Sequence, residues 1–364
     1  MNNAYPVTVI RACTVIISTI LGIGVLSFPN FAAKAVDSGA PLLTLEAMGV
    51  SMFSLVILAL LVRKFPRENI IQFSERLIGK WPARFFNLLL IIFFVICSGL
   101  STRDFGEVVI AVLLPKTPIE VSIIIMLIVV VASSRRSVVK FSFIHSFYLP
   151  FIIIVALVIF LASLRDYDMV NLLPVIGNHP SRVVYAALSI ASLFQSAFVL
   201  TLLVPYMIRP RKILASAVWG VIISGIVYLM IIISTIALFG SEETKLLAYP
   251  TLDAARSAVI PGGAFERLDD IFIIGWVVSV YTTIYSNYYF SVIAAKDLFR
   301  IRDHRLFVSY LIPIVFVIAM IPHDTRQFFV YGNLIFIYGM ILTTGYPLLL
   351  LLLSLIRGVK ESSQ

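Results

Sequence analysis

The chain has 364 residues, of which 60% are hydrophobic and only 13% are charged, and its mean hydropathy is +1.03. Soluble domains carry about 25% charged residues, so this composition excludes a soluble fold and predicts an integral membrane protein with the lipid bilayer as its surroundings. The formal net charge of +9 does not indicate a nucleic-acid partner, because the basic residues form no long run and no binding module.

Apolar runs of about 17 to 25 residues are long enough to cross a bilayer as helices. Ten such runs predict an all-α integral membrane protein that forms one membrane domain over residues 1–364. The runs cover approximately residues 7–31, 42–62, 84–110, 119–134, 141–164, 183–205, 213–239, 268–294, 305–321 and 328–355. Because the number of spans is even, both termini are expected on the same side.

The loops between these runs differ in positive charge. The loops on the side of the termini, with the tail, carry 18 of the 28 Lys and Arg residues, and the opposite loops carry 8. Since Lys and Arg collect in cytoplasmic loops, both termini are predicted to be cytoplasmic. The longest loop on the other side, residues 240–267, contains Pro250 and Pro261, and we expect a short helix or strand in it as a lid.

The first apolar run contains a break signal. Residues 18–29 read Ser-Thr-Ile-Leu-Gly-Ile-Gly-Val-Leu-Ser-Phe-Pro, and both the glycines and the proline weaken a helix that has no water to satisfy its freed backbone. Discontinuous helices build midplane sites for small ligands and ions in transporters. The alternative is that Gly22 and Gly24 serve close packing between helices.

A second interruption is predicted in the sixth run, at residues 189–198, where Ser192, Gln195 and Ser196 fall within one turn. The two breaks lie five spans apart, so the second copy enters the membrane from the opposite side. This spacing predicts a five-plus-five inverted repeat, with one copy over residues 7–164 and the other over residues 183–355.

A break in the first helix offers both ends of a helix dipole to a ligand. The N-terminal end of the second half suits a carboxylate, and the carbonyls that close the first half suit an ammonium group or a cation. A free amino acid presents both charges. The predicted substrate-binding residues are Leu21, Gly22, Ile23 and Gly24 in the first helix and Ser192, Phe194, Gln195 and Ser196 in the sixth.

The run from Gly22 to Pro29 resembles the opening helix of the amino acid–polyamine–organocation (APC) superfamily, whose fold is LeuT-like. The length and the ten predicted helices resemble the B subunit of GerA-type nutrient germinant receptors, the endospore germination permeases. The resemblance implies a subunit in the spore inner membrane that senses an amino acid or similar germinant. It also implies two partners, an A-type membrane subunit and a C-type lipoprotein subunit. A proton- or sodium-coupled amino acid transporter is the alternative function.

Sodium-coupled relatives of this fold hold a cation between hydroxyls of the eighth helix and carbonyls of the first. By this resemblance Thr282, Thr283 and Ser286 are candidate ion-coupling residues, although Ser and Thr also bond to their own helix. A proton is the other possible coupling ion, and His145 in the fifth run is the histidine placed to titrate within the membrane. Alternatively, His145 is a structural histidine that is hydrogen-bonded near a helix end.

Charged residues also occur inside the predicted spans. Arg103, Asp104 and Glu107 lie in the third run, and Arg103 and Glu107 have the i,i+4 spacing of a helical ion pair. Because charges in hydrocarbon must pair or face water, this cluster forms either an outer gate or a paired structural group.

Other motifs are missing from the sequence. It has no phosphate-binding glycine loop, no paired Cys or His with metal-ligand spacing, and no Gly-x-Ser-x-Gly elbow. We therefore expect neither an enzyme nor a cofactor or metal.

Overall fold

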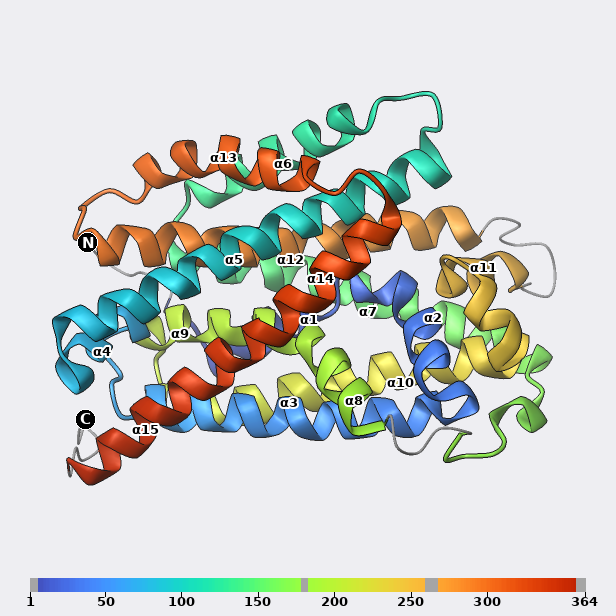
Figure 1. Cartoon of the computed structure of the whole chain (residues 1–364), viewed down its shortest axis with the longest axis horizontal. Helices are drawn as coiled ribbons and strands as arrows, with labels where there is room; N and C mark the ends of the chain where they lie inside the picture. Colours follow the sequence, from blue (N-terminus) through green and yellow to red (C-terminus); the bar gives the residue numbers. More distant parts are fainter. Residues whose placement is uncertain (1–5, 178–182, 259–267, 358–364) are drawn as a thin grey trace.

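The computed structural model describes residues 6–177, 183–258 and 268–357, and this part of the chain is almost entirely helical (Figure 1). Its α-helices are α1 (Val9–Ile20), α2 (Gly24–Val36), α3 (Ala40–Arg63), α4 (Ile70–Ile78), α5 (Lys80–Val108), α6 (Ile119–Ser134), α7 (Val138–Ser163), α8 (Val183–Ala191), α9 (Leu200–Leu203), α10 (Ile213–Leu246), α11 (Pro250–Ser257), α12 (Leu268–Leu298), α13 (Arg305–Met320), α14 (Thr325–Met340) and α15 (Tyr346–Ile356). Two π-helical turns, η2 (Val109–Leu113) and η9 (Ile341–Gly345), continue α5 and α14.

Polar residues at the helix ends fix where several helices begin. The Thr8 side chain accepts a hydrogen bond from the backbone of Arg11 and starts α1. Asn69 and Gln72 form a reciprocal capping box at the start of α4. Each of these side chains satisfies a backbone N–H group that the first helical turn leaves without a partner.

The first apolar run forms two helices instead of one. α1 ends at Ile20 and α2 begins at Gly24, and the backbone of Leu21 departs from helical geometry with φ −76° and ψ 83°. The N–H of Gly22 donates to the carbonyl of Ile20 at 3.0 Å, a tight local turn that replaces the helical pattern. Residues 21–23 therefore connect two helical halves within one apolar segment.

The sixth apolar run also changes geometry along its length. α8 ends at Ala191, and residues 192–199 form a tighter 3-10 helix, η6 (Ser192–Val199), before α9 begins at Leu200. Long 3-10 stretches are uncommon because their hydrogen bonds are poorer, and within a longer helix they mark a strained or hinge segment. The change begins at Ser192, inside the segment where the sequence predicts an interruption.

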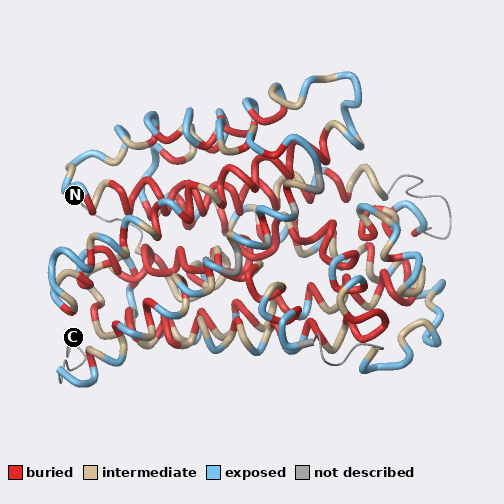
Figure 2. Tube along the Cα trace, in the orientation of Figure 1, coloured by how far each residue is buried: buried red, intermediate tan, exposed pale blue. Residues whose placement is uncertain are grey.

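α12 forms the centre of the fold. Its side chains Trp276, Tyr285, Tyr288, Tyr289 and Phe290 are almost completely buried. Figure 2 shows mostly buried residues along the central helices. Aromatic rings from other helices pack against it. Phe94 of α5 lies 4.4 Å from the ring of Phe290, and Phe141 of α7 stacks on Tyr289 at 4.8 Å.

The outward-facing surface of the helices is apolar, as lipid requires. Among the described residues, seven helical segments are long and apolar enough to cross a membrane, and three shorter apolar helices accompany them. The shorter ones are Val9–Ile20, Ile119–Ser134 and Arg305–Met320. The chain is therefore a multi-pass membrane protein, and the count of ten spans stays a prediction.

The two ends of the helical bundle differ in what covers them. Figure 1 shows α4 and the end of α15 at one end, and α11 with α2 at the other.

In α4, burial raises the pKa of Glu75, but hydrogen bonds from Arg84 and Arg300 outweigh this effect and hold that pKa below its usual value. These bonds connect α4 to α5 and to the segment after α12.

The loop after α10 contains the short helix that the sequence predicts. α10 bends at Gly240, whose φ of +72° lies in the left-handed region that favours glycine. The following helix, α11, packs on α2, because the Thr251 hydroxyl donates to the carbonyl of Val25 at 2.7 Å. The part of this predicted lid at 259–267 lies outside the described residues.

Asn30 of α2 holds the end of α10 in place. Its side-chain amide donates to the carbonyls of Thr244, Lys245 and Leu247, at 3.3, 2.8 and 2.7 Å. A leucine at this position would leave these carbonyls without that donor, and each buried unsatisfied group costs about 1–3 kcal/mol.

Asn30→Leu is therefore expected to lower the apparent melting temperature of the purified protein. Asn171→Leu is the matched control, because Asn171 donates only one hydrogen bond to the same helix, to the carbonyl of Ala237 at 3.2 Å. Equal melting temperatures for the two variants would contradict the anchoring role of Asn30.

Candidate functional site

The carbonyl groups at the break after α1 accept hydrogen bonds from hydroxyls of other helices. The Tyr228 hydroxyl of α10 donates to the carbonyl of Ile20 at 2.9 Å. The Ser279 hydroxyl of α12 donates to the carbonyl of Leu21. These carbonyls lie where the helix stops and lack the partners of a continuing turn. Two helices distant in sequence therefore close the end of α1.

Two further hydrogen bonds of the same kind join α12 to the last turn of α1, just before the break. The Thr282 hydroxyl donates to the carbonyl of Ser18, and the Thr283 hydroxyl donates to the carbonyl of Thr19, both at 2.8 Å. Thr282 also bonds to the carbonyl of Ser279 within α12 at 2.7 Å. Thr282 and Thr283 thus contact both the first helix and their own helix, and their role in ion coupling stays a prediction.

His145 connects α7 to the same turn of α1. Its Nδ1 atom lies 2.6 Å from the Ser18 hydroxyl, and its Nε2 atom lies 3.2 Å from the Ser286 hydroxyl. Ser286 in turn lies 2.6 Å from the Thr19 hydroxyl. His145 is completely buried and stacks on the ring of Tyr285. The four predicted ion-coupling residues therefore all lie around the last turn of α1.

This polar network has limited freedom to bind a cation as it stands. The hydroxyls of Thr282 and Thr283 point their protons at carbonyls of α1, and a cation between them needs oxygen lone pairs from both partners. The arrangement therefore binds a cation only after the hydroxyls turn, and in it His145 connects α7 to α1 and α12 through hydrogen bonds.

The two glycines at the break have different surroundings. A Cβ atom added at Gly22 would lie 1.9 Å from the Thr283 hydroxyl oxygen, so α12 approaches α1 too closely for any side chain there. A Cβ atom at Gly24 would lie 3.0 Å from a methyl group of Leu193 in η6 and 3.1 Å from the Tyr228 hydroxyl. Gly22 thus permits helix packing, and Gly24 faces η6.

Of the predicted residues of the sixth run, Phe194 comes near the break through Tyr228. The Phe194 ring lies 5.8 Å from the ring of Tyr228, whose hydroxyl reaches the end of α1. The Ser192 hydroxyl donates to the carbonyl of Ser189 at 2.5 Å, and Ser196 is half-buried in the same segment.

Phe194 and Gln195 line a small cavity between η6, α3 and η9. Its volume is about 10 Å³, and its other lining residues are Ser51, Ser54, Leu55, Leu58, Ala191, Phe198, Met340 and Thr343. A space of this size holds about one water molecule. The cavity is therefore too small for an amino acid, and none of its lining residues belongs to residues 21–24.

Sequence reasoning missed Tyr228 as a residue of this site. The sequence does show a tyrosine within the long apolar run of α10, and a buried tyrosine hydroxyl usually needs a hydrogen-bond partner. It does not show that this partner is the carbonyl of Ile20, because the two residues are far apart in the chain. Ser18 and Thr19 precede the predicted break and contribute both side-chain and backbone groups to the network.

Residues 6–328 match the model of the family described as Spore germination protein. The chain belongs to this family. Spore germination protein YndE of Bacillus subtilis (strain 168) is 24% identical to it, over 96% of each chain. Spore germination protein B2 of the same organism is also 24% identical, over 98% of this chain and 97% of the relative. Spore germination protein A2 of that organism is also 24% identical, over 89% of this chain and 88% of the relative.

A solved structure shares the fold. The crystal structure of MhsT in complex with L-phenylalanine superposes with a TM-score of 0.68, over 95% of this chain and 98% of that chain, at 12% sequence identity. At this identity the likeness establishes the fold alone, which is the LeuT-like transporter fold. The predicted membership of the spore germination family and the predicted LeuT-like fold are thus confirmed.

In this member of the family, charged residues are buried near the C-terminal end of α5. Arg103 Nε lies 2.8 Å from Glu107 Oε1, with side chains only 8% and 10% exposed. The ion pair predicted from their spacing is therefore present. Asp104 is also buried, and the cluster comes near Tyr249, the residue just before α11. This position is compatible with either of the two predicted roles, a gate or a structural group.

The contact between Gly22 and Thr283 gives a test of how closely α12 must approach α1. Gly22→Ala is expected to destabilise the protein by about 1–3 kcal/mol, because a methyl group is forced into a filled space. Gly24→Ala is the matched control and should cost less, since the nearest atoms belong to the flexible end of Leu193.

A double-mutant cycle with Thr283→Gly, followed by thermal unfolding, tests whether the Thr283 side chain is what the new methyl group meets. The substitution removes the three atoms that lie nearest to a Cβ atom at position 22. The second substitution should restore part of the stability that Gly22→Ala loses. Strictly additive effects would show that the two positions do not compete for one space.

Proposed function

We propose that this chain is the germinant-sensing membrane subunit of a spore nutrient receptor. In this proposal a small amino acid or similar germinant binds at the interruption between α1 and α2, opposite η6, and the resulting change is passed to partner subunits. The observation that carries the proposal is the interrupted first helix of a LeuT-like fold in a chain of the spore germination family.

The break provides complementary charge for an amino acid. The N-terminus of α2 at Gly24 carries the positive end of a helix dipole, and the C-terminus of α1 at Ile20 carries the negative end. A carboxylate would bind near Gly22, Ile23 and Gly24, and an ammonium group would bind near the carbonyl of Leu21. The L-phenylalanine in the MhsT structure supports an amino acid as the class of ligand.

The wall opposite the break is formed by the sixth run. We assign Ser192, Phe194, Gln195 and Ser196 to this wall, and the cavity that Phe194 and Gln195 line is too small for an amino acid. The structure thus corresponds to a closed arrangement. A ligand shifts the balance between closed and open arrangements only if it binds one of them more tightly.

The proposal includes a topology and a setting. Ten spans would form two inverted repeats over residues 7–164 and 183–355, with broken first and sixth helices and both termini in the cytoplasm. The excess of Lys and Arg in the loops on that side supports this orientation. From the resemblance to germinant receptor subunits we place the chain in the spore inner membrane, beside an A-type membrane subunit and a C-type lipoprotein subunit; its membership of the spore germination family is compatible with this setting.

The alternative function is a secondary transporter for amino acids that is coupled to protons or sodium. The observation that favours it is the network around Ser18 and Thr19, where His145, Thr282, Thr283 and Ser286 meet. A proton on His145, or a sodium ion beside the two threonines, would change the bonds that hold α1. Either ion would then be linked to movement of the broken helix.

Ligand binding can be tested by thermal shift with each of the common amino acids, in sodium and in choline buffers. A ligand stabilises the state that it binds by RT ln(1 + [L]/Kd), so even millimolar affinity is detectable at high concentration. At least one amino acid is expected to raise the melting temperature of the wild type, and Gly24→Trp should abolish that response.

Gly49→Trp is the matched control, because Gly49 lies in α3 with open space around it. This variant should keep the response. A ligand response that survives in Gly24→Trp would contradict a site at the break. Uptake into vesicles then separates the two functions, since binding without flux supports the receptor and gradient-driven flux supports the transporter.

A further inference from the structure

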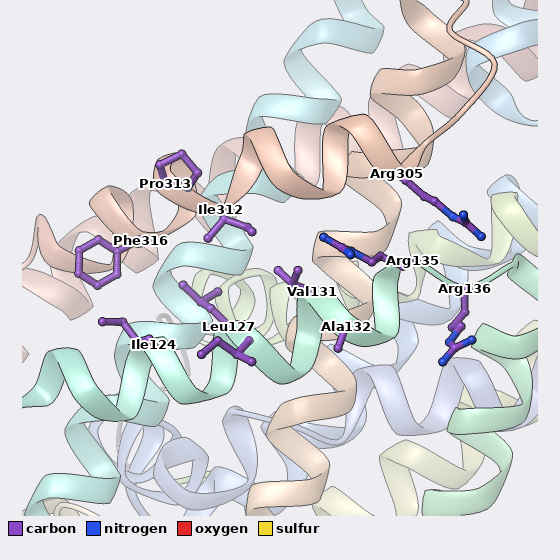
Figure 3. A pocket seen from close by; sticks show the side chains of 11 residues that line it. Ile124, Leu127, Val131, Ala132, Arg135, Arg136, Arg305, Ile312, Pro313 and Phe316 are labelled. Atoms are coloured by element: carbon purple, nitrogen blue, oxygen red, sulfur yellow. The ribbon is translucent and has the colours of Figure 1, made fainter.

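A groove runs along the outer surface between α6 and α13. Its volume is about 730 Å³, and Figure 3 shows the side chains of both helices that line it. Most of this lining is apolar and consists of Ile124, Leu127, Ile128, Val131, Ala132, Ile312, Pro313 and Phe316. Ile128 is 61% exposed, so the groove opens toward the surrounding lipid and not toward the core.

One end of the groove is positively charged. Arg135 and Arg136 follow the last turn of α6, and Arg305 is the first residue of α13. Figure 3 places all three at the same end of the groove, with Phe316 and Ile124 toward the other end. Apolar walls and a cluster of cations thus lie in line along the helices.

The three guanidinium groups are available to an anion. They are exposed, and across residues 6–177, 183–258 and 268–357 none of them forms an ion pair with a carboxylate. The nearby Asp303 accepts a hydrogen bond from the backbone N–H of Arg305 and lies 3.9 Å from His304. The C-terminal end of α6 carries a negative partial charge and the N-terminal end of α13 carries a positive one, so the two helix dipoles oppose each other here. The attraction of an anion to this end of the groove therefore depends on the arginine side chains.

We propose that this groove binds an anionic phospholipid, with its phosphate on Arg135, Arg136 and Arg305 and an acyl chain along the apolar walls. Arginine binds phosphate through paired N–H donors, and basic pockets between membrane helices recognise anionic headgroups. A general excess of positive charge on the cytoplasmic side explains arginines in loops, but it does not explain why three of them meet at the end of an apolar groove.

The proposed lipid would act on the region that holds the break of α1. The Tyr289 hydroxyl of α12 donates to the carbonyl of Arg136 at 2.9 Å, and the Tyr285 hydroxyl donates to the carbonyl of Ser133 at 3.1 Å. The same helix carries Thr283, which bonds to α1. A lipid that fixes the end of α6 would therefore stabilise the position of α12 against α1.

The test compares two lipids that have the same acyl chains. Phosphatidylglycerol and phosphatidylcholine are added in mixed micelles to the purified full chain, and lipid binding is followed by native mass spectrometry and thermal shift. Phosphatidylglycerol is expected to bind and to raise the melting temperature more than phosphatidylcholine. The triple substitution Arg135→Gln, Arg136→Gln, Arg305→Gln should weaken its binding about tenfold or more, since the loss of even one charge-assisted hydrogen bond weakens binding about tenfold.

A control variant removes the same charge elsewhere, at Arg209, Arg211 and Lys212, and should keep the preference for phosphatidylglycerol. Ala132→Phe leaves the charge unchanged but fills the groove, and it should also weaken binding. Inorganic phosphate alone should not reproduce the stabilisation, because it has no acyl chain. The proposal would be overturned if the two lipids bound equally, if neither bound, or if the triple variant bound phosphatidylglycerol as well as the wild type does. Binding of neither lipid would leave the groove as a face for a partner helix.

Discussion

The hydrogen bonds that close the end of α1 are the interaction on which the rest of the structure depends. A helix that stops inside a membrane leaves carbonyl groups that water cannot reach, and each must find a donor within the protein. Here the donors are hydroxyls of α12 and α10, which bond to the carbonyls of residues 18–21. This requirement brings α12 against α1 and explains why Gly22 has no room for a side chain.

The same bonds make α12 a connection between distant parts of the molecule. On one side it holds α1 through Thr282 and Thr283, and on another its tyrosine hydroxyls reach the end of α6. His145 adds α7 to the assembly through the hydroxyls of Ser18 and Ser286. Movement of α1 must therefore either break several of these bonds or carry α12 and α7 with it. This connection gives a physical route by which an event at the break changes the outer surface.

The sequence alone predicts the features that arise from local chemistry. The glycines and their neighbours predict a weak point at residues 22–24, and the i,i+4 spacing predicts the pair of Arg103 and Glu107. Features that depend on packing between distant segments are not predictable in this way. The partner of Ile20 is Tyr228, more than 200 residues away, and the need for glycine at position 22 comes from Thr283. The rotation of η6, which turns Phe194 and Gln195 toward α3, is likewise set by tertiary packing.

The strength of this closure sets how much ligand is needed to open it. Hydrogen bonds between membrane helices contribute about 0.6 kcal/mol each on average, so the four bonds to α1 hold it with roughly 2–3 kcal/mol. A ligand that binds only the open arrangement offsets this closure by RT ln(1 + [L]/Kd), which reaches about 2.7 kcal/mol when the ligand is present at roughly 100 times its Kd. A sensor and a transporter can therefore share this network. They would differ in whether the released energy moves a partner subunit or opens a path for the ligand, and that difference lies in the surfaces around the broken helix and not in the break itself.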